Sequence, residues 1–166
     1  MNLPKIKIDE TDLALLNLLQ KDGRITNVNL AKSLNLSETP CWRRQKRLEE
    51  AGCIQGYHGI LDRRILGLGV TAFVNITFAI HTGDSPYQFE AAIQEIPEVM
   101  SCHNVTGEAD YFLQIVAKDL ESYERILSGK LRRLPGVTSI KSSFSLRKIK
   151  DTTQVPLGGM DPINGK

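Results

Sequence analysis

The stretch Ser37-Glu38-Thr39-Pro40-Cys41-Trp42-Arg43-Arg44-Gln45-Lys46-Arg47-Leu48 predicts a helix with two unlike sides, and the rest of the chain is interpreted from it. Four of the five residues at 43–47 are cationic. At 100° per residue, one side carries Cys41, Gln45 and Leu48, and the opposite side carries Thr39, Arg43, Lys46 and Arg47, with Arg44 at its edge. A proline in the first turn costs little, because an early backbone N–H has no intrahelical partner. One side can therefore pack on a core while the other presents positive charge.

Two shorter helical patterns precede this stretch. Asp9 is a candidate N-cap for the first, with Asp12 at N3. That helix is expected to end at Asp22-Gly23, since glycine tolerates the left-handed conformation that follows many helices. Thr26 can cap the second helix, and Ser37 or Thr39 the third. Two helices joined by so short a turn, the second of them basic on one side, indicate a helix-turn-helix.

The distribution of charge supports a polyanionic partner only for the first part of the chain. The net charge of the 166 residues is +2, which is too small to argue for nucleic acid by itself. Residues 1–66 carry eleven Lys and Arg against eight Asp and Glu, whereas the remainder carries ten against eleven. Any binding of DNA is therefore expected at the N-terminal part, and locally at residues 43–47.

Several classes of protein are disfavoured by composition. No run approaches ~18 apolar residues, and the N-terminus lacks an apolar signal core, so neither a membrane span nor secretion is expected. Three scattered cysteines suit a reducing cytoplasm better than a disulfide framework. The three histidines do not form metal-ligand spacings with them. We expect no metal and no cofactor.

The periodicity changes in the second half of the chain. Residues 70–80 alternate over eleven positions, which predicts a β-strand. Further strands are expected over 99–105, 110–117 and 137–146, with a turn at 106–109. Helices are expected after Asp84-Ser85-Pro86 and after Asp119. Their apolar stripes are Phe89, Ala92, Ile93 and Ile96 in the first, and Leu120, Tyr123, Leu127, Leu131 and Leu134 in the second. The order β-α-β-β-α-β is typical of a ferredoxin-like domain.

These patterns predict an α+β protein of two domains. We expect a winged helix-turn-helix domain over residues 1–62, in which 53–62 form a wing or a connecting strand. A linker over 63–69 leads to a ferredoxin-like domain over 70–153. Residues 154–166 hold two prolines and three glycines and are expected to form a flexible tail.

Short motifs spread over nearly the whole chain carry a family resemblance. They include Arg24-Ile25-Thr26-Asn27, Leu36-Ser37-Glu38-Thr39-Pro40-Cys41, Ile54-Gln55-Gly56-Tyr57, Thr106-Gly107-Glu108-Ala109-Asp110-Tyr111 and Leu134-Pro135-Gly136-Val137. In their order and spacing, from residue 8 to residue 155, the chain resembles the Lrp/AsnC, or feast–famine, family of bacterial and archaeal transcription regulators. Thr39-Pro40-Cys41-Trp42 and Ser142-Ser143-Phe144 resemble the leucine-responsive branch more closely than the asparagine-responsive one.

The resemblance implies an assembly and an effector site. Members of the family pair their C-terminal sheets into dimers, which usually assemble into octamers, and bind a small effector, generally an amino acid, between dimers. Carried over by position, the effector residues are Thr106, Gly107, Glu108, Ala109 and Asp110, with Arg132 and Ser142 contributed by a neighbouring subunit. Arg132 departs from the asparagine-responsive pattern, which has an amide side chain there.

The chemistry of the 106–110 loop suits an amino acid independently of the resemblance. A zwitterion needs donors for its carboxylate and an acceptor for its ammonium. Backbone N–H groups near Gly107 can supply the first, because glycine permits close approach, and Asp110 or Glu108 can supply the second. The alternative is a simple hairpin turn beside a surface charge.

On the DNA side, the resemblance and the helical pattern together give a set of candidate contacts. These are Ser37, Glu38, Thr39, Arg43, Arg44, Lys46 and Arg47. Residues near the helix start, Thr39, Glu38 and Arg43, are expected at base edges, whereas Lys46, Arg47 and Arg44 are expected at phosphates. Trp42 is expected to pack on the helical core. The predicted function is a sequence-specific transcriptional regulator of amino-acid metabolism that responds to an amino acid.

Three alternatives remain open from the sequence. The basic helix can be a solvated face of a stand-alone amino-acid sensor. Glu108 and Asp110 can be an acid and a base, although no activated nucleophile, metal cluster or phosphate-binding loop accompanies them, and an enzyme is not expected. RNA binding by the sheet would need exposed aromatic residues, for which Phe73 and Phe112 are the candidates.

Overall fold

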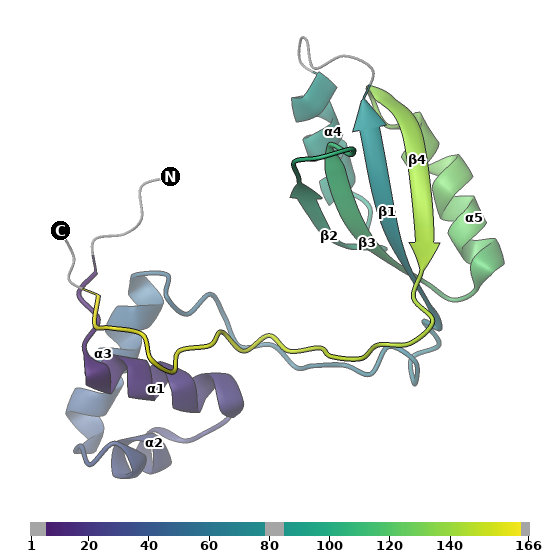
Figure 1. The fold of residues 1–166 in the computed structure, drawn as a ribbon. Helices are drawn as coiled ribbons and strands as arrows, with labels where there is room; N and C mark the ends of the chain where they lie inside the picture. The colour runs from purple at the N-terminus through teal and green to yellow at the C-terminus, as the bar shows by residue number, and fades with distance from the viewer. Residues whose placement is uncertain (1–5, 79–84, 164–166) are drawn as a thin grey trace. The chain divides into compact units, whose positions relative to one another are not determined.

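The chain divides into two units, each with its own core. The computed structural model describes residues 6–78 and 85–163 (Figure 1). A helical unit comprises residues 1–60 together with 150–166, and a sheet unit comprises residues 61–149. The expected end of the first strand at 79–80 and Asp84 of the expected helix start lie outside the described residues.

Three helices make up the first part of the helical unit: α1 (Glu10–Lys21), α2 (Asn27–Ser33) and α3 (Glu38–Glu50). The predicted cap of α1 is confirmed as a capping box, in which Asp9 Oδ1 accepts from the Asp12 N–H at 2.8 Å and Asp12 Oδ2 accepts from the Asp9 N–H at 3.0 Å. Thr26 caps α2. Ser37 is the N-cap residue of α3, although its side chain makes no capping bond.

A small apolar core joins these helices. Its buried members are Ile8, Leu15, Leu19, Leu30, Ala31, Cys41 and Leu48. The turn between α2 and α3 is closed by the Leu36 N–H, which donates to the Ala31 carbonyl, and by Asn35 at φ 53°. The left-handed residue expected after α1 is absent, because Asp22 ends that helix in an extended conformation and Gly23 is not among the positive-φ glycines of the described chain.

The expected wing or connecting strand over 53–62 does not form in the described structure. This segment is instead held to α3 by one side chain. The Tyr57 hydroxyl donates to Glu49 at 2.8 Å and accepts from Gln45 Nε2 at 3.0 Å. Burial, together with the bond to Glu49, raises the pKa of Tyr57 to about 12. Side-chain anchoring therefore replaces strand pairing here.

The C-terminal segment belongs to the helical unit, which differs from the separate tail predicted from residue 154. Ile163 and Ile8 exchange both backbone hydrogen bonds, at 2.9 and 3.0 Å. Gln20 Oε1 accepts from the Val155 N–H and Gln20 Nε2 donates to the Val155 carbonyl. The chain thus returns to α1 after completing the sheet unit.

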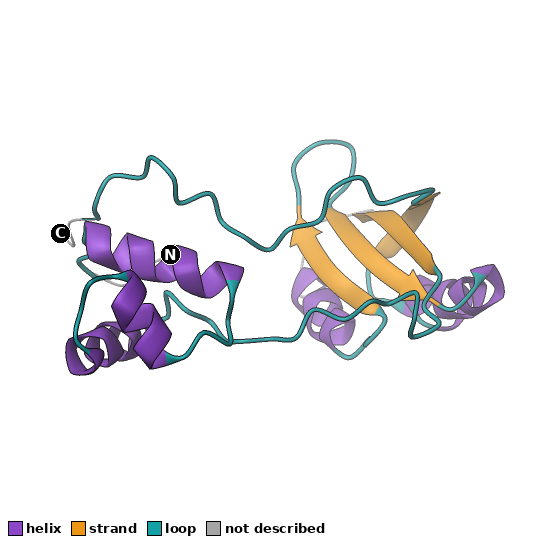
Figure 2. Ribbon diagram, turned by 90° about the horizontal axis from the view of Figure 1, so that it is seen from below, coloured by secondary structure: helices purple, strands orange, loops and turns teal. Residues whose placement is uncertain are grey.

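The sheet unit has four strands with two helices on one face (Figure 2). The elements are β1 (Val70–Phe78), α4 (Ser85–Gln94), β2 (Val99–Asn104), β3 (Tyr111–Ala117), α5 (Leu120–Gly129), the 3₁₀ turn Leu131–Arg133 and β4 (Val137–Phe144). The strand order is β2-β3-β1-β4 and every pairing is antiparallel. This arrangement confirms the predicted ferredoxin-like fold.

Packing against α4 and α5 explains the alternation in β1. Ala72, Val74, Ile76 and Phe78 are buried under the helices, as predicted. The stripe predicted for α5 needs correction, because Leu120 is 60% exposed whereas Ile126 is buried. Helix α5 stops at Gly129, and the 3₁₀ turn that follows reorients the last apolar residues toward the sheet.

The predicted linker over 63–69 is a closed turn within the sheet unit. Asp62 Oδ1 accepts from the Arg64 N–H at 2.9 Å, and the Leu68 N–H donates to the Arg63 carbonyl at 2.8 Å. Gly67 adopts φ 83°, which favours glycine. The residues that leave the helical unit are therefore locally structured.

Candidate functional site

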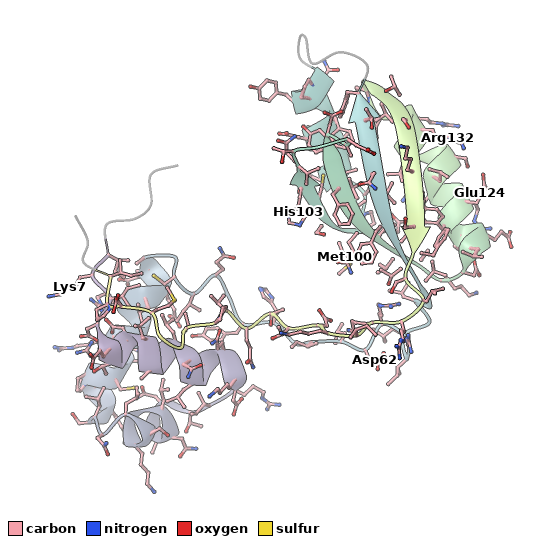
Figure 3. The ribbon with its side chains drawn as sticks, in the orientation of Figure 1. Lys7, Asp62, Met100, His103, Glu124 and Arg132 are labelled. Carbon is pink, nitrogen blue, oxygen red and sulfur yellow. The ribbon has the colours of Figure 1, made fainter. Side chains whose placement is uncertain are left out.

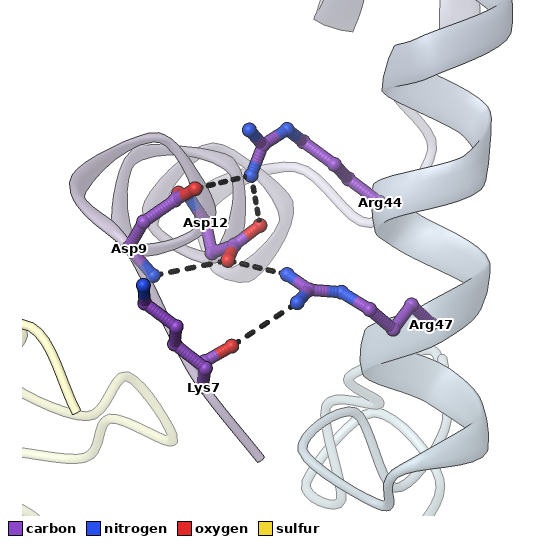
Figure 4. A network of polar contacts seen from close by, with 5 residues as sticks. All are labelled: Lys7, Asp9, Asp12, Arg44 and Arg47. Atoms are coloured by element: carbon purple, nitrogen blue, oxygen red, sulfur yellow. Dashed lines mark hydrogen bonds and ion pairs between the residues drawn. The ribbon is translucent and has the colours of Figure 1, made fainter. Parts of the chain in front are cut away.

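The cations of α3 fall into two groups that face different surroundings. Arg43 and Lys46 are exposed, on the side of the helix opposite to the buried Cys41 and Leu48. Arg44 and Arg47 instead bond to the carboxylates of α1 and its N-cap (Figure 4). Lys46 Nζ lies 3.8 Å from Glu50 Oε1 of the same helix, so the first group faces outward on α3 whereas the second is bonded to α1 and its N-cap.

The second group surrounds a buried charge. The side chain of Asp12 is 1% exposed; Arg44 Nη1 donates to its Oδ1 at 2.9 Å, and Arg47 Nη2 donates to its Oδ2. Arg44 also bonds to Asp9 at 2.7 Å, and Arg47 donates to the Lys7 carbonyl. Because a buried carboxylate is costly unless it is paired and hydrogen-bonded, this cluster fixes α3 against α1.

The same bonds shift two ionisation equilibria. Partial burial acts to raise the pKa of Asp9, but the hydrogen bonds from Arg44 and from the Asp12 N–H hold it below its ordinary value of 3.8. The bonds to Asp9 and Asp12 raise the pKa of Arg44. Asp9 and Arg44 are therefore both charged in the neutral pH range.

Three residues of α3 have surroundings in the structure that differ from those predicted. Arg44 and Arg47, predicted at phosphates, hold α1 and α3 together. Trp42, predicted in the helical core, is 50% exposed. It follows the buried Cys41 by one residue, which turns it about 100° away from the core.

A shallow hollow opens at the start of α3. Its volume is about 230 Å³, and its lining residues are Asn27, Glu38, Thr39 and Trp42. Asn27 Nδ2 donates to the Glu38 carbonyl at 3.0 Å, which ties the start of α2 to the first turn of α3. Within the described residues, the buried Asn27 Oδ1 has no hydrogen-bond partner. Neither Asn27 nor Trp42 was a candidate from the sequence. Asn27 lies on α2, for which the periodicity of α3 gives no position, and Trp42 was expected to pack on the helical core.

The predicted effector loop lies at one end of the sheet, between β2 and β3. Thr106, Gly107 and Glu108 are exposed, whereas Ala109 and Asp110 are half-buried. Gly107 has φ 121°, and a Cβ there would meet open space. Asp110 Oδ2 accepts from the Phe78 N–H at 2.8 Å, and the Asp110 N–H donates to the Ile76 carbonyl. Asp110 thus anchors the loop to the end of β1, which leaves Glu108 as the more accessible carboxylate.

The two other predicted effector residues have different surroundings in the sheet unit. Arg132 is exposed in the 3₁₀ turn and lies beside β4 (Figure 3). That turn precedes Val137, which pairs with Phe78 at the end of β1, so Arg132 and the loop lie at the same end of the sheet. Ser142 pairs with Val74, nearer the middle of β1, and its hydroxyl hydrogen-bonds to that of Tyr123.

A second hollow, of about 330 Å³, lies at the opposite end of β3. Its lining residues are Leu68, Glu98, Val116, Ala117, Lys118, Ser122, Arg125, Ile126 and Lys130. Two of its cations are already paired, Lys130 with Glu98 at 2.8 Å and Arg125 with Glu121 at 2.6 Å. It does not include the predicted effector loop.

Over residues 6–78 and 85–163, His, Cys, Asp and Glu side chains nowhere gather in threes suited to a metal ion. In that same part of the chain, each helix is too short or too polar to cross a bilayer. The candidate RNA-stacking pair, Phe73 and Phe112, stack on each other at 5.7 Å between ring centres.

Comparison with known proteins covers both units. A family model described as "Lrp/AsnC ligand binding domain" matches residues 71–155, and one described as "Winged helix-turn-helix DNA-binding" matches residues 8–55. The chain is 42% identical over 151 residues to the Bkd operon transcriptional regulator of Pseudomonas aeruginosa, with 91% of this chain and 99% of that protein covered. It is 39% identical over 152 residues to the leucine-responsive regulatory protein of Escherichia coli K12, with coverages of 92% and 93%.

The fold is similar to that of a solved regulator as well. A transcriptional regulator from Neisseria meningitidis, crystallised in complex with L-Met, matches with a TM-score of 0.86 and 38% identity. The match covers 91% of this chain and 97% of that one.

Proposed function

Because this chain belongs to the Lrp/AsnC family of transcriptional regulators, we propose that α3 docks in the major groove of operator DNA and that an amino acid bound by the sheet unit modulates this docking. The family consists of DNA-binding regulators with a ligand-binding domain, not of enzymes. The observation that carries the DNA part of the proposal is the outward side of α3, on which Thr39, Arg43 and Lys46 are exposed while Cys41 and Leu48 are buried.

The proposed contacts with DNA follow the exposure of each side chain. Ser37, Glu38, Thr39 and Arg43 lie nearest the helix start, where a recognition helix meets base edges. Lys46 lies one turn further and suits a phosphate. Arg44 and Arg47 are withdrawn from this set, since their guanidinium groups bond to Asp9 and Asp12. A dimer would place two such helices on half-sites one helical turn, or a multiple of it, apart.

The proposed effector site is the loop of Thr106, Gly107, Glu108, Ala109 and Asp110. Exposed backbone N–H groups beside Gly107 would bind the effector carboxylate, and the Glu108 carboxylate would accept from its ammonium group. Arg132, at the same end of the sheet, and Ser142 are proposed to complete the site from a neighbouring subunit. Two relatives support an apolar amino acid, since one is named leucine-responsive and another was crystallised with L-Met.

Assembly is part of the same proposal. The alternation of β1 places Phe73 on the face of the sheet opposite to its buried residues, where it stacks on Phe112. Figure 2 shows that α4 and α5 both lie on the other face. We propose that two copies pair through their sheets, that dimers assemble into octamers, and that the protein acts in the cytoplasm. A stand-alone amino-acid sensor is the second candidate, and loss of all DNA binding would favour it.

The test measures DNA and effector binding with the full chain. Electrophoretic mobility shift with the DNA upstream of the protein's own gene should show a salt-sensitive complex, because phosphate contacts release counterions. In a thermal-shift screen of the twenty amino acids, an apolar amino acid should raise the Tm. A ligand at ~100 times its Kd adds about 2.7 kcal/mol to the free energy of unfolding. The regulator proposal is refuted if the protein shows no salt-sensitive preference for any duplex from its own genome.

The variant Gly107→Asp tests the effector loop separately. The substitution places a side chain and a negative charge at a backbone with φ 121°, where the effector carboxylate is proposed to bind. The response to the effector should disappear while operator binding survives. An unchanged effector titration would reject this loop as the site.

A further inference from the structure

We propose that Trp42 is a specificity-determining residue of α3, whose indole ring packs against the C5-methyl group of a thymine in the major groove. The inference rests on the proposed docking of α3 in DNA and names a chemical feature of the operator that this chain recognises.

The position of Trp42 on α3 points it toward DNA. It lies three residues after Thr39 and four before Lys46, so the three share one side of the helix. Half of its surface is exposed, although it is the largest apolar residue of a helix whose Cys41 and Leu48 are completely buried. A single exposed apolar residue needs no explanation in general. Here it stands on the face that the groove would cover, where docking removes its surface from water.

The ring is held in place before any DNA arrives. Lys46 Nζ lies 5.1 Å from the centre of the Trp42 ring, within the range of a cation–π contact. The ring also lines the 230 Å³ hollow, together with Glu38 and Thr39. Asn27 Nδ2, bonded to the Glu38 carbonyl, fixes the hollow from the side of α2. A flat apolar surface is thus presented at a set orientation beside polar groups.

The chemistry of these groups selects among base edges. The ring face offers neither donor nor acceptor, so in the major groove it suits the one apolar feature there, the thymine methyl group. The Glu38 carboxylate accepts hydrogen bonds only, so it suits an exocyclic amino group such as cytosine N4 on a neighbouring base pair. Thr39 can either donate or accept. The hollow therefore favours a thymine next to an amino-bearing base.

Replacement of thymine by uracil tests the proposal, because uracil lacks only the methyl group. Duplexes bound by the full-length protein are first selected from a random library. Each thymine of the selected site is then replaced singly by uracil, and Kd is measured by fluorescence anisotropy. For the wild type we expect one position in each half-site at which uracil weakens binding about fourfold, as burial of one methyl-sized group gives. Replacement in both half-sites should weaken it about fifteenfold.

Variants connect that position to Trp42. Trp42→Ala should bind the thymine and uracil duplexes equally at that position, whereas Trp42→Phe should keep part of the difference because it keeps an aromatic face. Tyr87→Ala, which removes an exposed ring of the sheet unit, is the matched control and should leave the wild-type pattern intact. Far-UV circular dichroism establishes that each variant is folded, and the wild-type uracil scan stands even if Trp42→Ala fails to fold.

Two results would overturn the proposal while leaving DNA binding intact. One is a wild-type protein that binds every singly substituted uracil duplex as tightly as the parent. The other is a folded Trp42→Ala variant that keeps the full wild-type difference between the thymine and uracil duplexes, which would assign the methyl contact to another residue. Failure of the selection to enrich any duplex would instead count against the proposed function itself.

Discussion

The helical unit and the sheet unit hold themselves together by different means. Among the described residues, the core of the sheet unit has fifteen buried apolar residues, and it includes the mutually packed rings of Phe78, Phe89 and Tyr111. The core of the helical unit has seven, supplemented by the fully buried carboxylate of Asp12 and its two arginines. A small core therefore leaves the orientation of α3 dependent on charge, whereas the sheet unit depends mainly on apolar packing.

The largest effect is expected from Phe89→Ala, which removes a ring from the apolar core of the sheet unit. Phe89 is completely buried, with its ring 4.5 Å from that of Tyr111 and 5.2 Å from that of Phe78. Loss of the ring should destabilise the sheet unit by ~3–5 kcal/mol. Urea unfolding followed by far-UV circular dichroism measures this. The fluorescence of Trp42, the only tryptophan of the chain, reports on the helical unit, and its transition should stay in place.

Asp12→Ala removes the buried carboxylate of the helical unit. It should destabilise the helical unit and leave the sheet unit unchanged. Removal of a buried partner typically costs ~3–5 kcal/mol. We expect the lower end, because Arg44 and Arg47 are 31% and 45% exposed and water can solvate them. The Trp42 fluorescence transition should shift to lower urea, and the sheet transition should not. Glu121→Ala, which breaks the exposed pair with Arg125, is the control, with a loss of ~0.5 kcal/mol or less. Equal shifts in both transitions would show that the two units do not unfold separately.

Two neighbouring arginines sharpen the comparison within α3. Arg44→Ala should destabilise the helical unit by about 1.5 kcal/mol, because it removes charge-assisted hydrogen bonds to Asp9 and Asp12. Arg43→Ala should change stability by less than about 0.5 kcal/mol and abolish specific DNA binding. Anisotropy titrations and urea unfolding of both variants, with oligomer size checked by light scattering, give the result. A loss of the assembly in Arg43→Ala would contradict the division into two units.

The smallest effect is expected from acid, and in the helical unit it is expected at Asp9. The pKa of Asp9 is lower in the folded chain than its ordinary value of 3.8. A carboxyl group of this kind stabilises the fold above its unfolded pKa, and the contribution is lost as pH falls through the folded pKa. Unfolding followed by Trp42 fluorescence from about pH 5 to about pH 2 should show this loss below pH 3.8, and Asp9→Asn should reduce it. If the free energy of unfolding falls just as steeply with decreasing pH in Asp9→Asn, the acid sensitivity belongs to other carboxylates.

Local rules were sufficient to predict most of the fold. The cap at Asp9, the cap at Thr26 and the alternation along β1 each depend on residues that are close in sequence, and the structure confirms all three. The order β-α-β-β-α-β then left few topologies open. The absence of a strand over 53–62 has a different origin, because a strand needs a partner, and Tyr57 binds α3 instead.

The candidate DNA site was less predictable, since it depends on contacts between helices. A helical projection places Arg47 on the side opposite to Cys41, but it cannot show that Asp12 of α1 lies within reach of that guanidinium. It also cannot distinguish an exposed Trp42 from a buried one, because the ring lies at the border of the two sides. The capping pattern Asp9–Asp12 was visible in the sequence, whereas the burial of Asp12 and its second use as an arginine partner were not.

The return of the chain to α1 after β4 has a practical consequence for work on this protein. A fragment that stops after residue 60 would lack Val155 and Ile163, and would lose the bonds that these residues make with the Gln20 side chain and with the backbone of Ile8. Such a fragment is therefore a poor substitute for the DNA-binding half. Because Ile163 pairs with Ile8, which immediately precedes the N-cap Asp9 of α1, a tag inserted near Ile163 would disturb this unit and is better avoided in operator-binding studies.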